Sequence, residues 1–319
     1  MASQINHQGS TFEKKKPDQE PLPSKIAQTT VTYIYQANIG RCWRNVSMTW
    51  CKTLMSHTLH LTIDSTIGKL KYTCKIDVKP WSFWSKKGYK SLDVDGHEVE
   101  VYWDVRSAKF SDGCPEPTGD YYVAFVFDDE VPLLVGDLKK KAYKRTKSKP
   151  ASIEAMQVVK KENVFAKKSF VTRAMLNTEK TTVAATMART KTKESEVIVE
   201  SLMSSGVNEP EMSIYIEGVK LIHVKNLQWK FRGNETVMVN NNEKAVQVYW
   251  DVHDWLFSGS DDSSGPGVFT FKPGFAEAEE SDMSDRESYD NEYGNSSVYY
   301  STRNAPSEFC LILCAYKLD

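Results

Sequence analysis

The sequence predicts an all-β fold, an antiparallel β-sandwich built from two related halves. Three observations indicate this. The phrase Val-Tyr-Trp-Asp-Val stands at residues 101–105 and returns unchanged at residues 248–252. Short runs rich in β-branched and aromatic residues recur along the chain, as strands require. Turn-forming pairs such as Asp95-Gly96 separate these runs, whereas sustained helical periodicity is rare.

The repeated phrase predicts one buried strand face in each half. Alternate residues of a strand point to opposite faces, so the valines and the tryptophan of each copy share one face. Propeller blades also carry Trp-Asp pairs, but they recur every ~40–45 residues in at least ~3 copies, so two widely separated copies favour a duplicated β unit. The expected core residues of the repeat are Val101, Trp103, Val105, Val248, Trp250 and Val252.

Other strands are expected, in chain order, at residues 60–63, 121–127, 196–199 and 213–216. The alternation in residues 229–232 predicts a strand whose aromatic residues, Trp229 and Phe231, are buried while Lys230 and Arg232 face water. The expected organisation is a disordered tail at 1–28, a first β half at 29–138, a basic linker at 139–162 and a second β half at 163–319. An acidic disordered insertion is expected at 276–308 within the second half.

The basic linker is the strongest candidate for a contact with another molecule. It can be a solvated connection, or it can bind anionic lipid, RNA or an acidic protein. Tyr143 is its only aromatic residue, which argues against nucleic acid because single-stranded bases stack on aromatic rings. The seven cations of this candidate contact are Lys139, Lys140, Lys141, Lys144, Arg145, Lys147 and Lys149.

The acidic insertion carries eight carboxylates against Arg286 alone between Glu277 and Glu292. A carboxylate three residues after Ser284 fits an acid-directed kinase, so Ser284 is a candidate phosphorylation site. An autoinhibitory contact between this insertion and the basic linker is one hypothesis. Deletion of residues 277–300 should then tighten anion binding.

The sequence contains no recognised catalytic constellation. It has no HExxH motif, nucleophile elbow, phosphate-binding loop or dinucleotide fingerprint. Asp104 and Asp251, each beside a repeated tryptophan, could form a paired-carboxylate site, but a structural hydrogen-bonding role is favoured. We therefore expect no catalytic, metal-binding or cofactor-binding residues, no cofactor, and six reduced cysteines.

Composition and charge limit the location and the partners. The chain has 41 basic and 42 acidic residues, so it is not a nucleic-acid binder by overall charge. Residues 1–20 lack an apolar run, and no stretch is long and apolar enough to span a membrane. The expectation is a soluble cytoplasmic protein, with nuclear or peripheral-membrane sites as alternatives.

Several phrases resemble those of the plant family catalogued as domain of unknown function 868. They include residues 49–52, 101–110, 229–235 and 250–257, and the resemblance extends over about residues 28–319. Membership implies a plant protein without established activity, catalytic residues or cofactor. The leading hypothesis is a non-catalytic interaction module with a protein partner. The alternatives are binding to anionic membrane through the basic linker and an unrecognised enzyme; the oligomeric state is left open.

Overall fold

The computed structural model describes residues 29–67, 69–78, 85–166, 169–176, 194–202, 209–240, 244–257, 265–274 and 309–317. These residues are mostly strands, which confirms the predicted all-β fold. The predicted tail at 1–28 and the acidic insertion at 276–308 lie outside the described residues.

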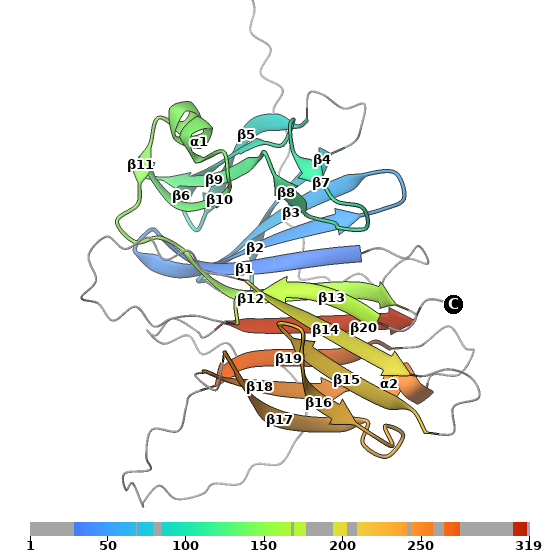
Figure 1. The fold of residues 1–319 in the computed structure, drawn as a ribbon. Coiled ribbons are helices and arrows are strands. Elements are labelled where there is room, and N and C mark those ends of the chain that lie inside the picture. Colours follow the sequence, from blue (N-terminus) through green and yellow to red (C-terminus); the bar gives the residue numbers. More distant parts are fainter. Residues whose placement is uncertain are drawn as a thin grey trace, which may run out of the picture.

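One nine-stranded sheet runs through the whole molecule (Figure 1). Its strands, in spatial order, are β17 (Arg232–Val239), β18 (Lys244–Asp251), β19 (Gly267–Gly274), β20 (Cys310–Lys317), β12 (Met156–Ala166), β1 (Thr29–Ile39), β2 (Cys42–Lys52), β3 (His57–Asp64) and β4 (Lys71–Val78).

Smaller sheets and two short helices complete the described structure. A five-stranded sheet is ordered β11 (Lys149–Pro150), β10 (Glu130–Gly136), β9 (Tyr122–Phe127), β6 (His97–Asp104) and β5 (Lys87–Val94). A four-stranded sheet is ordered β13 (Ser169–Ala174), β14 (Ser195–Leu202), β15 (Glu211–Ile216) and β16 (Val219–Val224). A short ribbon pairs β7 (Lys109–Phe110) with β8 (Pro117–Gly119), and the helices are α1 (Lys139–Thr146) and α2 (His253–Phe257).

Two separate hydrophobic cores lie against the shared sheet. One core joins strands β1 to β4 with the five-stranded sheet and contains Trp50 and Phe125. The other joins strands β17 to β20 with the four-stranded sheet and contains Trp255 and Phe269. The molecule is therefore a pair of β-sandwiches that share one continuous sheet.

Strand β12 connects the two sandwiches. It pairs antiparallel with β1 of the first half and parallel with β20 of the second, with Val159 opposite Cys310. The structure departs here from the expected linker at 139–162, because these residues form α1, β11 and the first part of β12. Lys160 and Glu162 occupy buried positions of β12. Because charged residues are not expected in a strand core, the sequence does not indicate this strand.

The repeated phrase forms the same local hairpin in both halves. Gly88 on β5 lies opposite Trp103 on β6, and Gly233 on β17 lies opposite Trp250 on β18. Each indole covers its glycine, since an added methyl group on Gly233 would approach the ring of Trp250 to 2.2 Å. Each indole N–H also donates to a backbone carbonyl just before the first strand of its hairpin, at 2.8 Å in the first half and 3.1 Å in the second.

The strand orders of the two halves correspond as well. The order β1-β2-β3-β4 matches β13-β14-β15-β16, and β5-β6-β9-β10 matches β17-β18-β19-β20. The four repeated valines and Trp250 are buried, while Trp103 is partly buried against the first core. These correspondences agree with a duplication, whose common origin stays a prediction.

Candidate functional site: the basic helix α1

Helix α1 forms through tertiary packing rather than through its own sequence. An isolated helix of fewer than ~12–15 residues is marginal in water, and α1 has eight residues. Its first turn contains no acidic residue, and Leu138 provides no side-chain cap. The helix ends at Thr146, and the cap residue Lys147 has the left-handed backbone (φ 60°) that often ends a helix. Lys144 and Arg145 complement the helix dipole in the last turn.

The apolar side of α1 packs on the outer face of the five-stranded sheet (Figure 1). Ala142 is buried, and Tyr143 and Leu138 are partly buried beside it. The sheet contributes a small third cluster of buried side chains that includes Tyr122 and Ala124. This contact places residues 139–146 on the surface of the first sandwich as a helix.

The seven predicted cations all lie on this surface and are exposed to solvent. We call them the α1 basic surface. Lys149 forms an ion pair with Glu130 at 3.2 Å. Within the residues that the structure describes, the other six cations form no ion pair.

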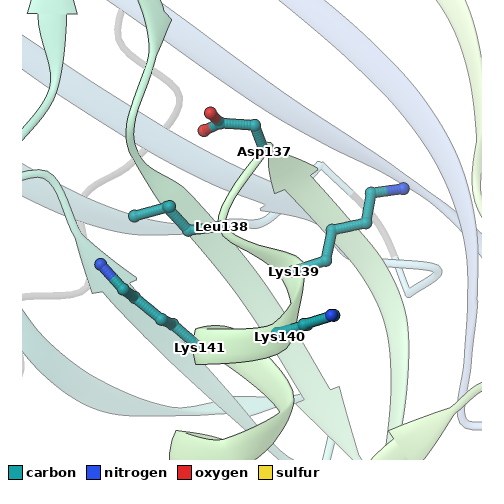
Figure 2. A pocket seen from close by; sticks show the side chains of 5 residues that line it. All are labelled: Asp137, Leu138, Lys139, Lys140 and Lys141. Atoms are coloured by element: carbon teal, nitrogen blue, oxygen red, sulfur yellow. The ribbon is translucent and has the colours of Figure 1, made fainter.

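The start of the helix borders a hollow of about 590 Å³ (Figure 2). Asp137, Leu138 and the three consecutive lysines line it. In Figure 2 the side chains of Lys139 and Lys140 extend to one side of the chain and Lys141 extends to the other. The cations thus spread over a broad area instead of converging on one point.

Asp137 is the acidic residue next to these lysines, and it is held in place by the backbone. Hydrogen bonds from the backbone of Asp120 and Tyr121 lower the pKa of the Asp137 carboxyl group. Its Oδ1 accepts the N–H of Tyr121 at 3.1 Å. This carboxylate therefore fixes the turn before α1.

The two candidate carboxylates of the repeat do not form a common site. Asp104 lies on β6 of the five-stranded sheet, and Asp251 lies on β18 of the nine-stranded sheet. Asp104 accepts hydrogen bonds from Nε and Nη2 of Arg106 at 2.9 and 2.8 Å. Burial by itself raises the pKa of Asp104, but the bonds from Arg106 outweigh it and lower that pKa. Asp251 is bound by Arg232 at 2.7 Å, so each carboxylate has its own structural partner.

A buried polar cluster between the two sandwiches was not predicted from the sequence. Lys160 on β12 bonds Glu162 at 2.8 Å and lies 3.9 Å from Glu116. Tyr33 donates a hydrogen bond to Glu116, and Thr172 of β13 donates one to Glu162. Burial alone lowers the pKa of Lys160, but the two carboxylates outweigh it and raise that pKa. The cluster ties β1 and β12 to the first strand of the second sandwich.

Two other expectations have different outcomes. Trp229 was expected to be buried, but it is 82% exposed because it lies in the turn before β17 and not on a strand. The candidate phosphorylation site Ser284 and the residues 277–292 lie outside the described residues.

Among the residues that the structure describes, no group of three or more His, Cys, Asp or Glu could hold a metal ion. No described helix is long and apolar enough to cross a membrane.

The fold and the site define an all-β protein of two sandwiches on one sheet, with a basic helix fixed to the outer face of the first. Comparison of the sequence with protein families shows which family includes this chain. It belongs to the family described as plant protein of unknown function (DUF868), whose model matches residues 26–317. No curated protein matches the chain, and no solved structure matches it.

Proposed function

We propose that the protein is a non-catalytic interaction module that binds an acidic partner protein through the α1 basic surface. One observation carries the proposal: a helix too short to form alone is held on a sheet with its cations directed to solvent. Binding residues commonly lie on segments that a rigid scaffold positions. Because the backbone of the helix is already ordered, only the cationic side chains lose conformational freedom when they meet carboxylates.

The direction of the side chains favours a protein over a membrane. Helices that lie on bilayers insert an exposed apolar face below the headgroups. In α1 the side chains of Ala142, Tyr143 and Leu138 face the sheet, so the helix offers cations without an apolar face. The same packing partly buries Tyr143, so less of its ring is open to stack on nucleobases.

A cytoplasmic location is part of this proposal. Cys51 and Cys74 are buried thiols that form no disulfide bond, as is typical of a protein in a reducing compartment. Burial also raises the pKa of the Cys51 and Cys74 thiols, which keeps them protonated and unreactive. Fluorescence microscopy of a tagged chain in plant cells tests the location, and accumulation in the secretory pathway would contradict it.

The binding proposal is tested with matched charge variants. In one variant, Lys140, Lys141, Lys144 and Lys147 become Gln, and in the control Lys71, Lys75, Lys220 and Lys272 become Gln. All eight lysines are exposed, so both variants should fold and have the same net charge. Four exposed ion pairs of about 0.2–1 kcal/mol each add up to about 0.8–4 kcal/mol, which predicts a loss of affinity between roughly fourfold and several hundredfold in the α1 variant alone.

The readout is quantitative capture from plant lysate at low and physiological salt, followed by titration of the captured acidic protein with purified chains. Vesicles containing phosphatidylserine form a second arm. Loss of the protein partner in the α1 variant but not in the control supports the proposal. Equal loss in both variants, or binding to vesicles without any protein partner, would contradict it.

A further inference from the structure

Aromatic side chains of the second sandwich gather at one end of the nine-stranded sheet. The ring centroids of Phe231 and Phe257 are 5.8 Å apart, and His253 lies 5.2 Å from each. Phe257 is 52% exposed, and Trp229, two residues before Phe231, is 82% exposed. We call Phe231, His253 and Phe257 the aromatic cluster, and Trp229 precedes it by two residues in the chain. Aromatic side chains left in water in this way often mark an interaction site.

The first sandwich shows that the fold does not require this exposure. Phe110 has the position after the repeated phrase that Phe257 has in the second half. Its ring stacks on His57 at 4.0 Å and meets Trp50 edge-on at 6.1 Å. In the second half, helix α2 instead places Trp255 in the core and leaves Phe257 outside.

The register of the sheet brings the start of β1 to the same end of the molecule. Thr30 of β1 is paired with Asn163 of β12. From Asn163, the line of paired residues across the sheet continues through β20 and β19 to Asp251, the last residue of β18. Four steps between strands at about 4.8 Å separate Thr30 from Asp251 by roughly 19 Å. His253, in the aromatic cluster, follows Asp251 by two residues.

The segment before β1 contains a proline-rich stretch that can reach this cluster. Pro21-Leu22-Pro23 lies six to eight residues before Thr29. At about 3.1 Å per residue, an extended chain of that length spans roughly 19–25 Å. The separation in the sheet and the length of the connecting chain therefore agree. Lys230 is exposed beside Trp229 and would complement the carboxylate of Glu20 next to the prolines.

We propose that Pro21-Leu22-Pro23 binds the aromatic cluster of the same chain. Proline rings restrict the unbound segment, so packing on aromatic rings costs little conformational entropy. The short connection gives the proline-rich segment an effective concentration in the millimolar range at the cluster, so that even a weak contact is formed much of the time. The N-terminal segment then covers an apolar surface that would otherwise bind other proteins.

Hydrogen exchange of the full-length chain tests this proposal. The variant P21S/L22S/P23S removes the proposed contact, and Phe12→Ser removes an apolar residue elsewhere in the same segment as a control. An effective concentration about ten times the dissociation constant predicts roughly tenfold faster exchange at residues 226–232 and 252–257 in the triple variant. The control should exchange like the wild type.

A reciprocal variant examines the other partner. Trp229→Ala combined with Phe257→Ala changes exposed side chains and should leave the fold intact. We expect faster cleavage by trypsin after Lys25 in this variant than in the wild type. Unchanged exchange in the triple variant would overturn the proposal. So would protection that persists in the triple variant and rises with protein concentration, because a second copy would then cover the cluster.

Discussion

At the scale of single residues, the most buried ion pair joins Arg44 on β2 to Asp95 in the turn between β5 and β6. Both side chains are nearly inaccessible to solvent. Asp95 also accepts hydrogen bonds from Ser65 at 2.6 Å, from the N–H of Thr66 at 3.0 Å and from Tyr72 at 3.0 Å. Burial by itself raises the pKa of Asp95, but these bonds and that from Arg44 outweigh it and hold the pKa far below its usual value.

This network predicts a specific loss of stability in acid. The pKa of Asp95 is depressed in the folded state, so its contribution is fully present above about pH 4, the pKa of an unfolded aspartate. That contribution is lost as the pH falls below 4 toward the folded pKa. Arg44→Met leaves the carboxylate without its cation and should cost about 3–5 kcal/mol at pH 7. Urea unfolding between pH 7 and pH 2 measures both effects, and a wild-type profile as flat as that of Asp95→Asn would contradict them.

The buried cluster around Lys160 leads to a second prediction. Lys160→Met leaves Glu162 buried without a cation and should cost about 3–5 kcal/mol. The double variant Lys160→Met, Glu162→Leu removes both charges and should recover most of that loss. A double-mutant cycle from urea unfolding gives the coupling between the two residues. Additive losses would show that the pair does not stabilise the junction.

For single residues, the sequence predicts the burial of those whose environment follows from the local pattern of apolar and polar residues. Alternation identifies the repeated valines as core residues, and Trp250 as well. It does not identify Lys160 and Glu162, because charged side chains are expected to face water, and Glu116, which helps to compensate Lys160, comes from a distant segment. It misplaces Trp229, since a turn and not a strand precedes β17. Non-local contacts and turn geometry account for these differences.

At the scale of elements, α1 depends on one small contact residue. Ala142 is buried against Tyr122 and Ala124, and a larger charged side chain there would be forced under the helix. Ala142→Glu should therefore destabilise the protein by about 1–3 kcal/mol and expose the amides of α1. Lys140→Glu, an acidic substitution on the exposed first turn of the helix, is the control and should not lower stability, because a negative charge is favourable at a helix N-terminus. Thermal unfolding and hydrogen exchange of residues 139–146 provide the measurements; equal effects of the two variants would contradict the packing described here.

The sequence predicts the charge of this segment but not its helix. Within α1, Ala142 and Tyr143 are the apolar positions, too few for a clear helical period. Lysine is a good helix former, but eight residues need tertiary support. The candidate site was therefore recognised by composition, while its rigid presentation came only from the structure.

At the scale of the whole molecule, one sheet joins two cores. The repeat predicts two related halves, but it cannot show that they share strands. The parallel pairing of β12 with β20 brings together segments about half the chain apart in sequence, and no local pattern specifies it. The shared sheet fixes the first sandwich, with its α1 basic surface, to the second sandwich, with its exposed aromatic cluster.

The proposed binding surface is tested by identifying the molecules that contact α1 in the cell. A photo-crosslinking amino acid replaces Lys140 in one chain and the exposed Lys220, on the four-stranded sheet, in another. After irradiation in plant cells, we expect an acidic protein linked at position 140, lost when the other α1 cations are neutralised, and not linked at position 220. The same proteins linked at both positions, or lipid alone at position 140, would contradict the assignment of α1 as the binding surface for a protein.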